Sequence, residues 1–175
     1  YPSTRHADAR DVGRRLAYID GIGRMPPRVS GLPSFILSRY GQVETHAEHG
    51  APLAPSDRPW PVVVFLPGHG APRAVYTGLI TRLASRGFVV VSLDHPYESA
   101  VTELPDGRVV GTLDGRRPGE RDRIGHMVRQ QDVRIADVRC VIDQLARPDV
   151  LTPALRGGSL EGHRVAVVGH SFGGA

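Results

Sequence analysis

The chain has no lysine and no asparagine among its 175 residues, so all 22 of its basic side chains are arginine. Without lysine it cannot form a Schiff base, use a serine–lysine dyad or bind a nucleotide with a P-loop lysine. Its single cysteine, Cys140, has no partner for an internal disulfide. No apolar run approaches the roughly 20 residues that span a membrane, and the opening residues do not read as a secretory signal. The compartment therefore stays open between cytoplasmic and secreted.

The net charge of +4 does not predict a nucleic-acid partner. The arginines are interleaved with aspartate and glutamate, and no dense basic block or aromatic array accompanies them. A metal site is not predicted either. His46 and His49 have a spacing that could bind a metal, but no third ligand stands nearby, so we interpret them as a loop or surface pair.

The most informative stretch is residues 165–175, where Val165–Val168 precede the run Gly-His-Ser-Phe-Gly at 169–173. Four apolar or small residues in a row are typical of a strand buried on both faces. Gly-x-Ser-x-Gly directly after a strand indicates a nucleophile elbow, a sharp strand-to-helix turn that holds a serine in a strained conformation. Side chains at the glycines would collide with the neighbouring strand and the next helix. Ser171 is therefore the predicted nucleophile.

A strand–loop–helix–strand unit is predicted over 61–96. Residues 61–66 and 88–93 are valine-rich and predict two buried strands, and 76–86 have helical spacing closed by Gly87. Such a unit predicts an α/β fold with a mostly parallel, doubly wound sheet. The loop after the first strand, 67–71, is suited to exposing backbone N–H groups.

The whole of 1–175 is predicted as one domain. Residues 1–60 are irregular and rich in proline and glycine, with helices favoured over Ala9–Ile19 and over Pro33–Tyr40, the latter burying Phe35, Ile36 and Leu37. Residues 97–123 predict a hairpin followed by a polar loop. Residues 124–175 predict a long helix to Leu145, then a loop over 151–163, a strand and the elbow. The apolar face expected on that helix consists of Val128, Ile135, Val138, Ile142 and Leu145.

The predicted chemistry needs a base, an acid and oxyanion donors beside Ser171. The expected donors are the backbone N–H groups of Phe172 and His69. In this architecture the acid and the histidine follow the serine, but only four residues do so here. His95 could line the pocket and Asp94 could pass for the acid, although Asp94 more naturally fixes its own loop. We expect the triad Asp and His to be absent from this chain.

Several runs resemble the platelet-activating-factor acetylhydrolases of the serine-esterase type and their bacterial lipase and esterase relatives. These runs are 165–175, 65–70, 83–90, 105–108, 134–145 and Tyr1-Pro2. The resemblance implies an α/β-hydrolase that lacks the first strand or strands and those after the elbow. Ser171 would be the nucleophile, with Phe172 and His69 as main-chain donors. Pro67 departs from the animal members, which have a histidine there, although relatives with proline exist.

The resemblance implies a carboxylic-ester hydrolase of lipid degradation, acting through an acyl-enzyme with no metal or organic cofactor. Its expected partners are a small-molecule or lipid ester and, at the exposed edge of the elbow strand, a complementing chain. Two alternatives remain: an inactive hydrolase-like binding module and an acyltransferase on the same fold. We expect the 175 residues alone to be inactive.

Overall fold

The computed structural model describes residues 1–3, 15–19, 22–25, 27–112, 122–147 and 160–175. Its centre is a three-stranded parallel sheet, in which β3 (Trp60–Leu66) lies between β4 (Val89–Ser92) and β7 (Leu160–Gly169). Val62 is paired with Val89 on one side and with Val165 on the other. Because the three strands are parallel, the loops that follow them leave the sheet at one edge, where sites of α/β proteins gather.

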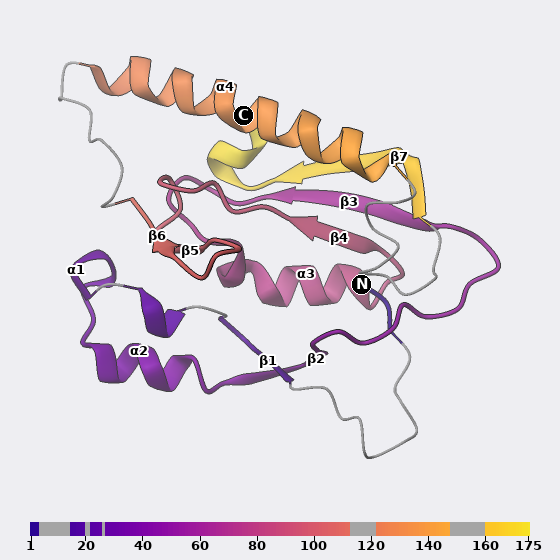
Figure 1. Ribbon diagram of the computed structural model, residues 1–175, viewed down its shortest axis with the longest axis horizontal. Coiled ribbons are helices and arrows are strands. Elements are labelled where there is room, and N and C mark those ends of the chain that lie inside the picture. The colour runs from indigo at the N-terminus through magenta and orange to yellow at the C-terminus, as the bar shows by residue number, and fades with distance from the viewer. Residues whose placement is uncertain (4–14, 20–21, 26, 113–121, 148–159) are drawn as a thin grey trace.

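Helices cover both faces of this sheet (Figure 1). The helix α3 (Thr77–Ala84) follows the short 3₁₀ helix η2 (Arg73–Tyr76) and connects β3 to the parallel strand β4. The long helix α4 (Arg123–Leu145) crosses the opposite face and precedes β7. The strand–helix–strand unit, the long helix and the α/β, mostly parallel, doubly wound class predicted from the sequence are confirmed.

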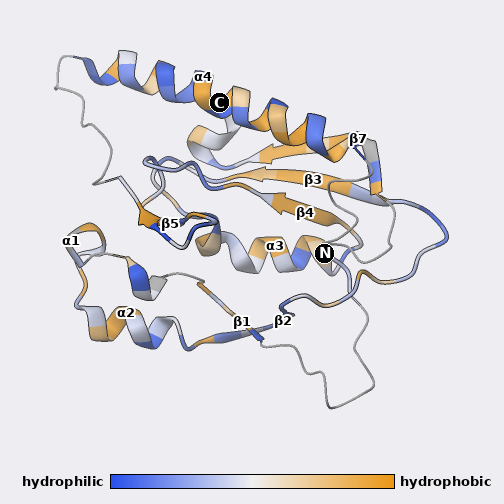
Figure 2. Cartoon of the chain, in the orientation of Figure 1, coloured by the Kyte–Doolittle hydropathy of each residue, from blue (hydrophilic) through white to orange (hydrophobic). Residues whose placement is uncertain are grey.

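The core is centred on β3, whose ribbon is mostly coloured as hydrophobic in Figure 2. Val62, Val64 and Phe65 are at most 1% exposed. Val62 and Val64 pack with Leu66 of β3 and Leu145 of α4, with Val138 and Val141 of α4 against the same cluster. Burying each such side chain contributes about 1.5–3 kcal/mol, so β3 is the element that fixes the sheet and the loop after it.

The expectation that the strand before Ser171 is buried on both faces is wrong. Val167 and Val168 are 48% and 42% exposed. The physical reason is position: among the described strands β7 is paired with β3 alone and forms one edge of the sheet. The strand also begins at Leu160, so 160–163 belong to it and not to the loop that was expected there.

The described residues among the first 53 form a small layer of short elements. The strand β1 (Arg15–Ala17) is antiparallel to β2 (Glu44–Glu48). Three short helices come between these strands in the sequence: η1 (Ile22–Arg24), α1 (Pro27–Ser30) and α2 (Ser34–Tyr40). An isolated bridge joins Ser3 to Leu53. The helix expected over 9–19 is wrong at residues 15–17, and 4–14 lie outside the described residues. The helix over 33–40 is confirmed, but only Leu37 of its three apolar residues is buried, and Phe35 is 67% exposed.

The hairpin predicted after the central unit is confirmed. The strands β5 (Thr102–Glu103) and β6 (Val109–Val110) are antiparallel and joined by a turn in which Gly107 has a φ of +82°. The loops expected at 113–121 and 148–159 lie outside the described residues. Within the described ranges, no helix is both long enough and apolar enough to span a membrane.

Candidate active site

Ser171 lies at a sharp turn between β7 and the short 3₁₀ helix η4 (Ser171–Gly174). Its φ is +54°, in the left-handed region that residues with a Cβ rarely adopt, at a cost of about 1–3 kcal/mol. Gly169, the last residue of β7, is in register with Leu66 at the end of β3. The N–H of His170 donates to the Leu66 carbonyl at 3.1 Å. The end of β3 therefore holds the turn that presents Ser171.

Two glycines of this turn are required by close approach of backbone. A Cβ added to Gly169 would lie 1.9 Å from the Gly173 carbonyl oxygen, and one added to Gly173 would lie 2.3 Å from the Leu66 carbonyl oxygen. The first collision is with the following helix and the second with the neighbouring strand. The steric role predicted for these glycines is therefore confirmed.

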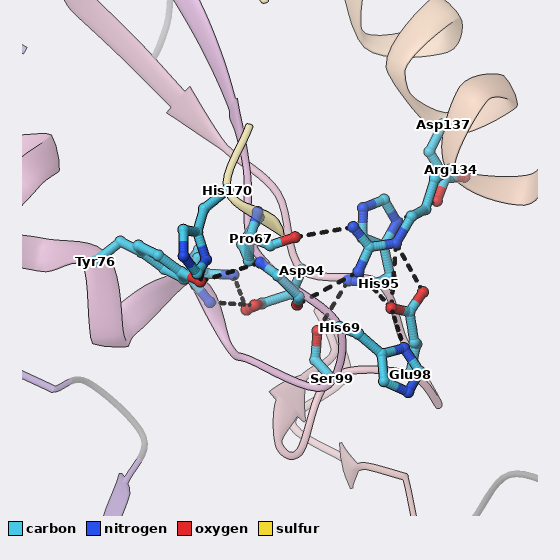
Figure 3. A network of polar contacts seen from close by, with 12 residues as sticks. Pro67, His69, Tyr76, Asp94, His95, Glu98, Ser99, Arg134, Asp137 and His170 are labelled. Carbon is cyan, nitrogen blue, oxygen red and sulfur yellow. Dashed lines mark hydrogen bonds and ion pairs between the residues drawn. The ribbon is translucent and has the colours of Figure 1, made fainter. Parts of the chain in front are cut away.

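The loop after β3 is tied to the turn through Tyr76 (Figure 3). The Tyr76 hydroxyl accepts a hydrogen bond from the Gly68 N–H at 3.1 Å and lies 2.9 Å from Nδ1 of His170. Because the oxygen already accepts from Gly68, its own proton is available to Nδ1. The Tyr76 ring packs on Phe65 of β3, with 4.9 Å between ring centroids. One buried strand thus positions both the loop and the turn.

The structure brings the two predicted donor residues together, although about a hundred positions separate them in the sequence. The rings of His69 and Phe172 meet edge to face, with centroids 5.6 Å apart. Among the residues that the structure describes, the N–H of His69 donates no hydrogen bond. Phe172 is the second residue of η4, and the first N–H groups of a helix have no acceptor within it. Both groups remain available to an incoming oxygen.

A buried ion pair beneath this loop was not predicted from the sequence. Arg134 of α4 and Glu98 are 3% and 6% exposed, and both terminal nitrogens and Nε of the guanidinium are engaged. Nε and Nη2 donate to the Glu98 carboxylate, while Nη1 donates to the Pro67 carbonyl oxygen at 2.8 Å. The sequence signal for Arg134 is its spacing. It stands four residues before Val138, so both lie on the face of α4 that packs on the sheet.

The two other residues considered for a triad, Asp94 and His95, stand directly after β4, and the side chain of each is bonded to a residue of another element. Asp94 accepts from the backbone N–H and the guanidinium of Arg73, at 2.6 and 2.7 Å, so it joins the end of β4 to the start of η2, and these bonds do not go to the following loop that it was expected to fix. Burial raises the pKa of the Asp94 carboxyl, and the interactions with Arg73 lower it by less. Nδ1 of the buried His95 lies 2.8 Å from the Asp137 carboxylate.

Ser171 has no base beside it in the part of the chain that the structure describes. Its hydroxyl makes no hydrogen bond with any described residue, histidines included. His170 is turned toward Tyr76, and His95 is engaged by Asp137 (Figure 3). Nor do the described ranges gather three or more metal-ligating side chains at one place. The described site thus offers a strained serine and two free N–H groups.

Comparison with known proteins gives consistent results. A sequence model of the family described as platelet-activating factor acetylhydrolase, isoform II, matches residues 14–108, just over half of the chain. The platelet-activating factor acetylhydrolase of Cavia porcellus is 28% identical over 174 residues, covering 90% of this chain and 40% of that protein. The enzyme of the same name from Canis lupus familiaris is 30% identical over 159 residues, covering 78% of this chain and 35% of that protein.

A solved structure resembles nearly the entire chain. The ferulic acid esterase of Streptomyces cinnamoneus superposes with a TM-score of 0.70 and 30% identity, covering 99% of this chain and 43% of that one. The coverage takes in the sheet, the loop after β3 and the turn at Ser171. The chain spans 40% or less of the length of the two acetylhydrolases.

Proposed function

The chain belongs to the family of platelet-activating factor acetylhydrolase, isoform II, and from this premise we propose that it carries the nucleophile and the oxyanion hole of a carboxylic-ester hydrolase. The observation that carries the proposal is the meeting of His69 and Phe172 beside Ser171. A serine esterase needs a hydroxyl and two N–H donors around one small volume. These residues supply both, on loops that leave the same edge of the sheet.

The proposed reaction proceeds through an acyl-enzyme. The Ser171 oxygen attacks the ester carbonyl carbon while its proton passes to a histidine base. The carbonyl oxygen becomes negative and accepts hydrogen bonds from the N–H groups of His69 and Phe172, each worth about 3–4 kcal/mol in the transition state. The intermediate collapses, the alcohol leaves with the proton, and water then hydrolyses the acyl-serine. We propose that the base and the acid come from outside the residues that the structure describes.

The substrate class is a carboxylic ester, and the names of the relatives support no finer choice. Two relatives are called acetylhydrolases of platelet-activating factor, and the structural neighbour is a ferulic acid esterase. These names differ in the acyl group and share the carboxylic ester. A panel of 4-nitrophenyl acetate, an acetylated glycerophospholipid and methyl ferulate would resolve acyl preference.

Labelling with a fluorophosphonate tests the nucleophile directly. The reagent phosphonylates an activated serine, so the full-length protein should carry one adduct, found by peptide mass at Ser171. Ser171→Ala should abolish the adduct and lower ester hydrolysis by about 10⁴-fold or more. Ser99→Ala is a matched control, because Ser99 lies in the loop after β4 and bonds only to its own loop. A folded protein that hydrolyses esters without a label at Ser171 would disprove the proposal.

A further inference from the structure

We infer that Arg134 and Glu98 form a positioning pair that holds the two oxyanion-hole residues, His69 and Phe172, in place. The inference rests on the proposed function and concerns residues that do not touch the substrate. Arg134 is buried under the loop after β3, and its guanidinium reaches backbone groups of that loop, a carboxylate and an aromatic ring.

The first step concerns the peptide between Pro67 and Gly68. Its carbonyl oxygen accepts from Nη1 of Arg134 at 2.8 Å, and its N–H donates to the Tyr76 hydroxyl at 3.1 Å. A peptide group is planar, with its C=O and N–H pointing in opposite directions. Two partners on opposite sides therefore fix the rotation of this plane. The bond to Tyr76 also means that the Gly68 N–H is not the oxyanion donor.

The next peptide, between Gly68 and His69, is held at one end only. Its carbonyl oxygen accepts from the Ala71 N–H at 3.1 Å and lies 3.5 Å from Nη2 of Arg134. Because the plane is rigid, fixing this carbonyl fixes the direction of the His69 N–H on the other side. That N–H is the one left free for substrate. The Ala71 N–H is the closer partner of this carbonyl, and Arg134 supports it and fixes the preceding peptide through the Pro67 carbonyl.

The same guanidinium also contacts the second donor residue. Its central carbon lies 4.8 Å from the centroid of the Phe172 ring, a cation–π arrangement. The His69 and Phe172 rings are nearly perpendicular, and Nδ1 of His69 is 3.3 Å from the Glu98 carboxylate. The pair therefore holds His69 and Phe172 relative to each other, from loops far apart in the sequence.

The chemistry of the pair explains why an arginine occupies this place. The guanidinium is a planar fork of five N–H donors, so it can serve the carboxylate and the loop carbonyl at once. A lysine ammonium keeps the charge but is a compact point on a flexible stem, and it cannot hold both partners in one plane. Glu98 neutralises the buried charge, so the pair acts through geometry and not through net charge.

Two variants separate orientation from folding. Arg134→Lys keeps the ion pair with Glu98 and removes the fork. Arg134→Met combined with Glu98→Gln removes both charges, so that neither is left buried alone, a change that proteins often tolerate. Asp137→Asn is the matched control: Asp137 lies one turn further along α4 and anchors the loop after β4 through His95, without a hydrogen bond to residues 67–71.

The first measurement requires no turnover. Backbone amide chemical shifts of His69 and Phe172 in the full-length protein should move in both Arg134 variants and stay near wild type in Asp137→Asn. The second is steady-state hydrolysis of 4-nitrophenyl acetate. Displacing the donors should lower kcat by about 100-fold, with KM within about 3-fold because the donors act mainly on the transition state. The preference for the ester over its thionoester should shrink, since sulfur is a weak acceptor.

The outcomes are distinct. Unmoved amides would overturn the inference whatever the activity, and an equal loss of kcat in Asp137→Asn would overturn it by showing that any loosening of α4 suffices. Moved amides with a selective loss of kcat would support it. If the amides move but the wild type neither hydrolyses esters nor labels at Ser171, the proposed function fails while the loop-orienting role of the pair is supported.

Discussion

The glycines around Ser171 allow a prediction whose size follows from the structure. Gly169→Ala would place a methyl carbon 1.9 Å from the Gly173 oxygen, and Gly173→Ala would place one 2.3 Å from the Leu66 oxygen and 2.6 Å from the Pro67 oxygen. Carbon and oxygen need about 3.0 Å or more, so backbone on both sides must move by about an ångström. That displacement exceeds ordinary overpacking, and we expect each substitution to cost about 3 kcal/mol or more.

The control lies in the same turn. A Cβ added to Gly174 would meet its nearest atom at 3.4 Å, an ordinary contact, and its φ does not require glycine. Gly174→Ala should therefore change the free energy of unfolding by less than about 1 kcal/mol, with a small gain from the stiffer unfolded chain.

Urea unfolding of the full-length protein measures both effects, through a shift of the midpoint at constant slope. Against a total stability of about 5–15 kcal/mol, a loss of 3 kcal/mol is readily resolved. The steric reasoning would be refuted if Gly169→Ala were as stable as wild type, or if Gly174→Ala were destabilised as strongly as the other two. Activity should follow the same order, because the displaced atoms belong to the turn of Ser171.

Two further predictions concern the segments that follow β3 and β4. Tyr76→Phe leaves the Gly68 N–H without the acceptor that it has in the structure, so the free energy of unfolding should fall by about 1–3 kcal/mol and kcat should fall more than KM rises; unchanged urea midpoints would contradict this. Asp94 has a raised pKa in the folded state, so the folded state binds its proton more tightly and stability should fall as pH rises from about 4 through the raised value. Asp94→Asn, which keeps an acceptor for the Arg73 N–H, should remove that decline, and identical pH profiles of unfolding would refute the assignment.

The central unit of the fold was predictable because its signals are local. Residues 61–66 are continuous apolar sequence, and β3 is indeed buried throughout its second half. The same pattern at Val165–Val168 predicted a strand buried on both faces, and this was wrong. A run of apolar residues indicates that a strand favours burial, but it does not show how many neighbouring strands cover it. Strand β7 has a neighbour on one side only within the described residues. Periodicity distinguishes strands from helices and leaves their order in the sheet open.

The long helix shows a second limit. Its bounds were predicted to within one residue at the start, but its buried face was only half right. Val138 and Leu145 pack on the core, whereas Val128 and Ile135 are 57% and 43% exposed. Residues seven positions apart lie on the same side of a helix, and α4 has two such sides. The prediction combined the side of Val128 and Ile135, which is exposed, with the side of Val138 and Leu145, which faces the sheet. The stripe that faces the sheet contains Arg134, which a hydrophobic pattern discards.

The ion pair of Arg134 with Glu98 could not be predicted from the sequence. The serine, the glycines and the loop after β3 could be found because each belongs to a short motif with a fixed geometry. The partner of Arg134 lies 36 positions away, in a loop with no motif of its own, so no spacing announces the pair. Yet burying a charge costs several kcal/mol unless its partner is close and well oriented. An arginine in register with core positions of a helix therefore implies a buried acceptor nearby, and in this chain the acceptors are a carboxylate and the carbonyl behind the oxyanion loop. A charged residue at a core-facing position of a helix, as Arg134 is in α4, therefore points to a functional loop as its partner.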